Sequence, residues 1–319
     1  MSQQLESELL KLYQQQLEVG VISQDIHNDI HKLTPITQDK ALKFYIQHNP
    51  HRVLRGIADI PNPTPKHIIK YKGGIPCFLC MDNIQVQWPN EQGHHCTIDD
   101  IPLVFLPNLY PIFPLHFTVA AGTHLPQIMN IPTLITLAKT LPTHWIIQNG
   151  PDAGATNPEH FHYQTFLPSN LPTNLPITHY PTTPIIQKNS LQIDRLTHPA
   201  SIYRFQFKTR EESQSVTTIL MDYLDRNPNH RLNILATYCP NKAQWQLMAL
   251  LRHTERRTDL YRSGQPGYAE AAGIISTTTE SHDRWIQNNL TLYTQLMTDI
   301  AAPKESETDF QTIISQICS

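Results

Sequence analysis

The sequence is short of glycine, of cysteine and of long apolar runs, and each shortage limits what the chain can be. Eleven glycines against 26 prolines indicate extended connections rather than flexible ones. Five cysteines, an odd number, argue against a secreted disulfide framework. The first residues, MSQQLESELLKLYQQQ, lack the basic and apolar regions of a signal peptide, and no window approaches the ~18 apolar residues of a membrane span. We therefore expect a cytoplasmic protein that has no membrane partner.

An excess of positive charge is also missing. Lysine and arginine number 24 against 27 aspartates and glutamates, which gives a net charge of −3. This balance argues against nucleic acid as the main partner, although a few local arginines can still bind a small anion such as phosphate. A chain of 319 residues has room for one large domain or for two of ~100–200 residues each.

The order of apolar strands and amphipathic helices predicts an α+β fold of two halves, each a mostly antiparallel sheet with helices packed on one face. We expect strands over residues 101–107, 116–122, 144–150, 160–167, 201–207, 231–238 and 244–252. We expect helices over residues 1–17, 211–226, 281–300 and 307–317, and one over 125–141 that Pro132 interrupts. Five prolines between positions 168 and 184 predict an extended crossover over residues 168–190, between an N-terminal half (1–167) and a C-terminal half (191–319). A long surface loop within one domain is the alternative.

The stretch NPEHFHYQTF, residues 157–166, places polar side chains at alternate positions of an apolar strand. Alternate residues of a strand point to one face, so His160, His162 and Gln164 share a face. Each of three buried polar groups would need its own partner, so a face turned towards a ligand is more economical. A lone histidine in a sheet is more often a hydrogen-bonded core residue, but a row of three polar groups favours a functional site.

A loop with two glycines comes just before this strand. The sequence NGPDAGATNP contains Gly150, Gly154, Thr156 and Asn157. Glycine allows close approach of the backbone, and exposed N–H groups beside a threonine hydroxyl can cradle a phosphate. An ordinary loop between strands is the alternative.

The whole stretch IIQNGPDAGATNPEHFHYQ resembles the active-site strand of the histidine-triad superfamily, in its transferase branch. That branch includes galactose-1-phosphate uridylyltransferase, the dinucleoside-tetraphosphate phosphorylases and the GDP-hexose phosphorylases, and its signature is His-x-His-x-Gln after a glycine-rich loop. The upstream PNLYPIFPLHFTVAAGTHLPQ and YIQHNPHR also resemble the branch, most closely the GDP-hexose phosphorylases and a related bacterial domain of unassigned function. The likeness is specific over residues 45–167 and loose over 200–280, and it implies two histidine-triad-like halves.

The resemblance implies a double-displacement nucleotidyl transfer. His162 would be the nucleophile that attacks the α-phosphate, because a neutral imidazole is nucleophilic near pH 7. Gln164 would hydrogen-bond a phosphate oxygen, and since glutamine cannot activate water as a base, the intermediate would wait for a phosphate acceptor. Asn149, Thr156 and Asn157 match positions that hold the phosphates or orient the nucleophile.

The segment PCFLC spaces Cys77 and Cys80 as two thiolates on one metal ion. In a reducing compartment, zinc or simple burial is favoured over a disulfide. The resemblance supplies His124 and His160 as the other two ligands, and it implies a structural Zn2+ that fixes the strand carrying His162. Three further histidines are alternative ligands: His94, His95 and His116. No organic cofactor is expected.

Two groups of arginines are candidate phosphate ligands. Arg52 and Arg55 lie in NPHRVLRG, where solvated surface arginines are the alternative. A second group lies in LLRHTERRTDLYR, with a solvated loop as the alternative: Arg252, Arg256, Arg257 and Arg262.

By resemblance, Glu270 in YAEAAGIIS would bind sugar hydroxyls. Asn108 begins Asn-Leu-Tyr-Pro where the branch often has Asn-Asp-aromatic-Pro, which leaves the base and the sugar open.

These observations together predict a nucleotidyltransferase or phosphorylase. Its substrate would be a nucleotide sugar or another nucleotide with a P–O–P bond, and its acceptor phosphate or a sugar phosphate. The alternatives are a phosphorylase or hydrolase of dinucleoside polyphosphates, and a non-catalytic, zinc-stabilised nucleotide-binding module. A monomer and a homodimer are both compatible with a chain of two halves.

Overall fold

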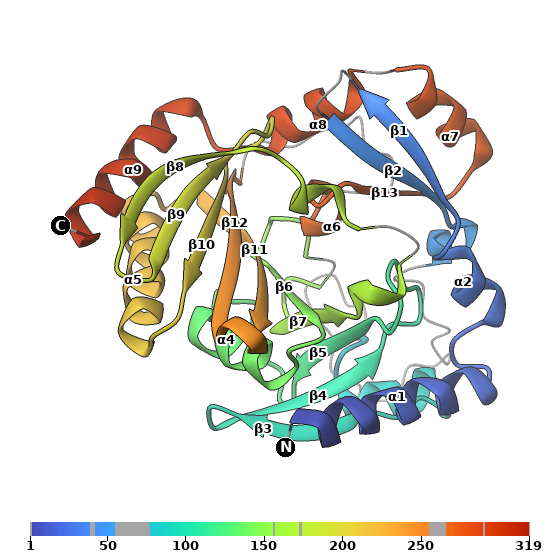
Figure 1. Cartoon of the computed structure of the whole chain (residues 1–319). Coiled ribbons are helices and arrows are strands. Elements are labelled where there is room, and N and C mark those ends of the chain that lie inside the picture. The colour runs from blue at the N-terminus through green and yellow to red at the C-terminus, as the bar shows by residue number, and fades with distance from the viewer. Residues whose placement is uncertain are drawn as a thin grey trace.

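The computed structural model describes residues 2–38, 42–54, 77–155, 157–171, 174–254, 266–289 and 291–318. A ten-stranded sheet, antiparallel at every pairing, forms its centre (Figure 1). From one edge to the other, the strands are β3 (His94–Ile98), β4 (Ile101–Pro107), β5 (Phe117–Ala121), β7 (His162–Phe166), β6 (Trp145–Asn149), β11 (His230–Cys239), β12 (Gln244–His253), β10 (Ile202–Phe207), β9 (Leu191–Leu196) and β8 (Thr182–Lys188). The α+β class predicted from the sequence is confirmed.

Four helices pack on one face of this sheet: α1 (Ser2–Glu18), α4 (Ile131–Thr140), α5 (Arg210–Arg226) and α9 (Lys304–Cys318). Their apolar side chains share one core with alternate residues of the strands, among them Tyr163 of β7 and Phe205 of β10. Helix α5 begins at a capping box, in which Thr209 and Glu212 satisfy each other's backbone N–H groups. The helix over residues 125–141 was predicted to be interrupted by Pro132; instead α4 begins at Ile131, because a proline in the first turn lacks only an N–H that has no intrahelical partner.

A second core covers part of the opposite face of the sheet. A small sheet of β1 (Leu33–Gln38), β2 (Leu42–His48) and β13 (Ile274–Thr277) joins segments from both ends of the chain, with β2 and β13 parallel. Beside it lie α6 (Tyr268–Ala271), α7 (Glu280–Gln287) and α8 (Leu292–Ile300), so the single helix predicted over residues 281–300 is two helices (Figure 1). The remaining elements are α2 (Gln24–Asp29), α3 (Met81–Gln87) and the 3-10 helices η1 (Pro50–Leu54), η2 (Pro168–Asn170), η3 (Pro176–Thr178) and η4 (Pro240–Lys242).

The sheet continues across the boundary that the sequence suggested between the two halves. Strand β6 of the first half pairs with β11 of the second, with Asn149 opposite Asn233. The proline-rich stretch forms η2 and η3 and then the edge strand β8, which tolerates Pro184 with a shift in register between Pro184 and Ile186. The division into residues 1–167 and 191–319 remains a prediction.

Candidate active site and metal centre

The predicted nucleophile, His162, is the first residue of β7 and is 4% exposed. Its Nδ1–H donates to the backbone carbonyl of His160 at 2.7 Å, so Nε2 carries the lone pair. Burial lowers the pKa of His162 to about 4, which keeps the imidazole neutral at pH 7. His160 itself lies two residues before the point where the strand begins, rather than inside it as predicted.

Gln164 is half-buried on β7, two residues after His162 and therefore on the same face. Its Oε1 lies 3.3 Å from Nε2 of His116, whose Nδ1 accepts a hydrogen bond from the N–H of Ile112 at 3.2 Å. Because Nδ1 of His116 is an acceptor, the neutral ring donates from Nε2, and the amide of Gln164 keeps its N–H groups for another acceptor. His116, an alternative metal ligand in the sequence, therefore lies beside the glutamine instead.

The four residues predicted as metal ligands lie together. The ligand atoms of Cys77, Cys80, His124 and His160 are all within 4.8 Å of one another, and within the described residues this is the one such cluster of three or more. Cys77 Sγ lies 3.3 Å from Nδ1 of His160, and Cys80 Sγ lies 3.1 Å from Nδ1 of His124. Zn–S and Zn–N bonds of ~2.3 and ~2.0 Å around a tetrahedron place sulfur and nitrogen roughly 3.5 Å apart, so this donor set fits zinc.

Hydrogen bonds from neighbouring groups orient the ligand atoms of the cluster. His160 donates from Nε2 to the carbonyl of Ala121 at 2.9 Å, which leaves Nδ1 to face the sulfurs. Asn157 donates from Nδ2 to Sγ of Cys77 at 3.2 Å, and Asn83 donates to the Cys77 carbonyl at 2.9 Å. Hydrogen bonding between the two thiols holds the pKa of Cys77 well below its usual range and raises the pKa of Cys80 well above it, so Cys77 is the thiol that loses its proton first. Asn157, predicted at the phosphates, thus borders the cluster.

The loop after β6 packs against a segment near the C-terminal end of the chain. Gly154 has a φ of +87°, and an added Cβ would lie 2.6 Å from the carbonyl oxygen of Pro266, so only glycine fits this turn. The side-chain oxygen of Asn149 accepts hydrogen bonds from Asn233 and, at 3.0 Å, from the N–H of Tyr268. Thr156 lies outside the described residues.

Asn108 and Arg52 belong to a second group of contacts, near the end of β4. Asn108 accepts from the N–H of Tyr110 at 3.0 Å and donates to the hydroxyl of Thr118, which pairs with Gln164 across β5 and β7. Arg52 donates to the carbonyl of Tyr110. Both residues therefore shape the segment 108–111 next to the glutamine.

The structure gives Arg252 and Glu270 partners within the protein. Arg252 is 1% exposed and donates to the carbonyls of Ala153, at 3.1 Å, and of Pro266. Glu270 is 6% exposed and accepts from the N–H of Gly267 at 2.7 Å as the cap of α6. In this structure the hydrogen bonds of Arg252 and Glu270 stabilise the loop after β6 and the segment packed on it. The predicted contacts of these two residues with phosphate and sugar remain predictions. Four other predicted or associated arginines lie outside the described residues: Arg55, Arg256, Arg257 and Arg262.

Sequence reasoning missed Gln127 and the role of His116. Gln127 is 4% exposed and its side-chain amide lies between the ends of β6 and β7. The only signal was a glutamine in the apolar stretch LPQIM, which does not reveal a partner 35 positions away.

His94 and His95, the other alternative metal ligands, lie on the edge strand β3, where His94 is 3.5 Å from Glu8.

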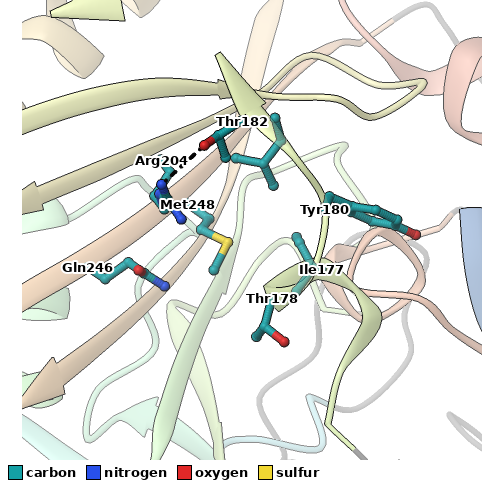
Figure 2. A pocket seen from close by; sticks show the side chains of 8 residues that line it. Ile177, Thr178, Tyr180, Thr182, Arg204, Gln246 and Met248 are labelled. Atoms are coloured by element: carbon teal, nitrogen blue, oxygen red, sulfur yellow. Dashed lines mark hydrogen bonds between the residues drawn. The ribbon is translucent and has the colours of Figure 1, made fainter. Parts of the chain in front are cut away.

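A separate cavity of about 190 Å3 lies against the C-terminal strands. Figure 2 shows the side chains around it, which are those of Ile177, Thr178, Tyr180, Thr182, Leu196, Arg204, Gln246 and Met248. Arg204 donates to the fully buried carboxylate of Asp194 at 3.0 Å, which neutralises its charge. The cavity contains no histidine, cysteine or carboxylate, and the strand register places Met248 three strands from Gln164. It is therefore not part of the histidine site.

The chain therefore combines a ten-stranded antiparallel sheet with a His-x-His-x-Gln segment that lies next to a Cys2His2 cluster. Residues 12–167 match a family model described as "Domain of unknown function (DUF4922)". The comparison with curated protein sequences gives no match.

Three solved structures of yeast Ap4A phosphorylase Apa2 are similar to this chain. The complex with Ap4A has a TM-score of 0.59 and 13% identity, and the alignment covers 94% of this chain and 97% of that one. The complex with AMP has a TM-score of 0.57 and 10% identity, with coverage of 94% and 97%. The structure named without a ligand has a TM-score of 0.57 and 12% identity, with coverage of 94% of both chains. At these identities the likeness shows that the fold is shared along nearly the whole chain.

No helix among the described residues has the length and apolar character that crossing a bilayer requires.

Proposed function

We propose that this protein is a nucleotidyltransferase of the phosphorylase type. It cleaves the P–O–P bond of a nucleoside diphosphate sugar, or of a similar nucleotide, and passes the nucleotidyl group through His162 to phosphate or to a sugar 1-phosphate. The observation that carries this proposal is the 2.7 Å hydrogen bond from Nδ1 of His162 to the carbonyl of His160. That bond leaves the lone pair on Nε2, on the face of β7 that also carries Gln164.

Both reaction steps balance with the groups that β7 presents. In the first step Nε2 of His162 bonds to the α-phosphorus, and the bond from that phosphorus to the bridging oxygen breaks, so that the rest of the substrate leaves as a phosphate. In the second step an oxygen of the acceptor phosphate attacks the same phosphorus, the P–N bond breaks and the neutral imidazole returns. The amide of Gln164 donates to a phosphate oxygen as charge develops in both steps.

Zinc has a structural role in this proposal. Cys77, Cys80, His124 and His160 hold the ion, which when bound joins residues 77–80 to the turn before β7. All four positions are filled by protein ligands, so a tetrahedral site leaves no position for substrate. The chemistry therefore belongs to His162 and Gln164.

A dinucleoside polyphosphate is the second candidate substrate. The observation in its favour is the fold shared with yeast Ap4A phosphorylase, which extends over 94% of this chain. The chemical steps are the same, because Ap4A also offers a P–O–P bond next to an α-phosphorus. A nucleotide sugar differs only in the leaving group.

Hydrolysis and simple binding are weaker candidates. Gln164 cannot take a proton from water, so a nucleotidyl-histidine would react with phosphate faster than with water. A non-catalytic module would bind nucleotide and give no product.

The test incubates the zinc-loaded protein with α-labelled Ap4A and with α-labelled nucleoside diphosphate sugars. We expect an acid-labile, base-stable adduct on His162, and release of product that accelerates when phosphate is added. His162→Asn should form no adduct. If no nucleotide labels the protein, or if His162→Asn labels equally well, the covalent mechanism is wrong; turnover that ignores phosphate would indicate a hydrolase.

A further inference from the structure

The strands β6 and β7 separate just where the proposed active site begins. Their ladder runs through Trp145–Phe166, Ile146–Thr165 and Ile147–Gln164. Beyond that last pair the side chain of Gln127 takes the place of the missing ladder bonds. Its Oε1 accepts from the N–H of His162 at 2.8 Å, and its Nε2 donates to the carbonyls of His162 at 3.0 Å and of Asn149 at 2.8 Å.

We propose that Gln127 is a positioning residue for His162, an inference that rests on the proposed function of that histidine. It binds both backbone polar groups of His162 and the carbonyl of Asn149, the residue predicted to hold phosphate. The amide thereby fixes the spacing between the end of β6 and the nucleophile. It touches neither Nε2 nor any other reacting atom, so its effect passes through the backbone of His162.

The segment that carries Gln127 is itself tied down. The N–H of Gln127 donates to Pro158 at 3.0 Å, and the carbonyl of Leu125 accepts from Phe161 at 2.6 Å. His124 of the Cys2His2 cluster lies at one end of the segment, and the cap of α4, Asn130, at the other. Because the segment around Gln127 is fixed at both ends, the side chain of Gln127 can orient the start of β7 rather than move with it.

Gln148 provides a matched control. It is fully buried, like Gln127, and it also bonds a backbone segment, since it donates to Ile128 at 2.6 Å and accepts from the N–H of Asn130 at 3.1 Å. Neither of these hydrogen bonds involves His162. Loss of either amide leaves buried backbone groups without partners, so both losses destabilise the fold, but only the loss of Gln127 releases the nucleophile.

The experiment compares Gln127→Met and Gln148→Met in the zinc-loaded full-length protein. A displacement of ~1 Å at a reacting group can cost on the order of 100-fold in rate, so we expect Gln127→Met to slow single-turnover adduct formation from labelled Ap4A by about 30- to 100-fold. Gln148→Met also loses a buried amide, but its rate of adduct formation should stay within about threefold of the wild-type rate. Gln127→Glu keeps the acceptor for the His162 N–H but loses the donors, and it should fall between the wild type and Gln127→Met.

A second readout does not need a substrate. In 15N-histidine NMR spectra, His162 of the wild type should show a single tautomer with the proton on Nδ1, and Gln127→Met should show a mixture of tautomers. Adduct formation in Gln127→Met within threefold of the wild type, or an equal loss in Gln148→Met, overturns the proposal. If the wild type forms no adduct at all, the proposed function fails, while an unchanged His162 tautomer in Gln127→Met would separately refute positioning by Gln127.

Discussion

At the scale of single residues, we propose different roles for three histidines because a backbone group occupies a different ring nitrogen or hydrogen-bonding function in each. His160 donates from Nε2 to Ala121, which leaves Nδ1 for the metal site. His162 donates from Nδ1 to His160, which leaves Nε2 for the proposed attack on phosphorus. His116 accepts at Nδ1 from Ile112, so its Nε2–H is turned towards Gln164. The three side chains are of one type, and the hydrogen bonds around them are what distinguish the proposed structural, nucleophilic and orienting roles.

Removing His116 should therefore impair Gln164 without touching the nucleophile. In His116→Leu the amide of Gln164 is free to rotate, and a lost buried hydrogen bond of about 1–2 kcal/mol corresponds to a fall of roughly 5- to 30-fold in the rate of adduct formation. The rate is measured with labelled Ap4A at saturating concentration. His144→Leu is the control, because His144 is also a buried histidine but bonds Thr143, next to the start of β6. Equal rates in His116→Leu and the wild type would show that Gln164 needs no orienting partner.

At the scale of elements, the sequence predicts strands well where local pattern decides and fails where distant segments meet. Strand β4 spans the predicted residues, because IPLVFLP is apolar throughout and contains the β-branched Ile101 and Val104 and the aromatic Phe105. The small sheet was missed, because the parallel pairing of Ile275 with Ile46 joins residues far apart in the chain. The Cys2His2 set was found through a family likeness, whereas Gln127 could not be found, since no spacing rule links it to His162.

The Cys2His2 cluster joins residues 77–80 to His124 and to the turn before β7, and this gives a prediction of its own. The purified protein should contain about one equivalent of zinc, and Cys77→Ser should lose most of it, because the serine hydroxyl is a poor replacement for a thiolate ligand. Metal content is measured by mass spectrometry, and the thermal midpoint is followed with and without a chelator. Cys239→Ser serves as the control, since Cys239 is exposed and lies outside the cluster. Near-zero zinc in the wild type, or an unchanged content in Cys77→Ser, would remove the metal site.

At the scale of the whole molecule, one buried histidine, in the turn between β9 and β10 of the ten-stranded sheet, links that sheet to the small sheet and its helices. His198 accepts at Nδ1 from the N–H of Ala200 at 3.1 Å, and its Nε2 lies 3.3 Å from the hydroxyl of Tyr293 in α8. That hydroxyl donates to the carbonyl of Glu270 at 3.0 Å, and the ring of Tyr293 stacks on Phe44 of β2 with centroids 4.8 Å apart. The N-terminal and C-terminal segments thus meet in one core around a histidine that must stay neutral.

Acid should therefore loosen this junction by a predictable amount. Burial lowers the pKa of His198 to about 3 in the folded chain, against a value of about 6.5 when unfolded. Between these two pH values the unfolded chain binds a proton that the folded chain does not, so the contribution of His198 to stability is present above pH ~6.5 and is lost as the pH falls. From pH 7 to pH 5 this loss is about 2 kcal/mol. The urea midpoints of the wild type and His198→Gln should accordingly converge on acidification, because the variant lacks the titrating group and any release of zinc affects both proteins. A constant gap between the two midpoints over this range would mean that His198 is not held neutral by the fold.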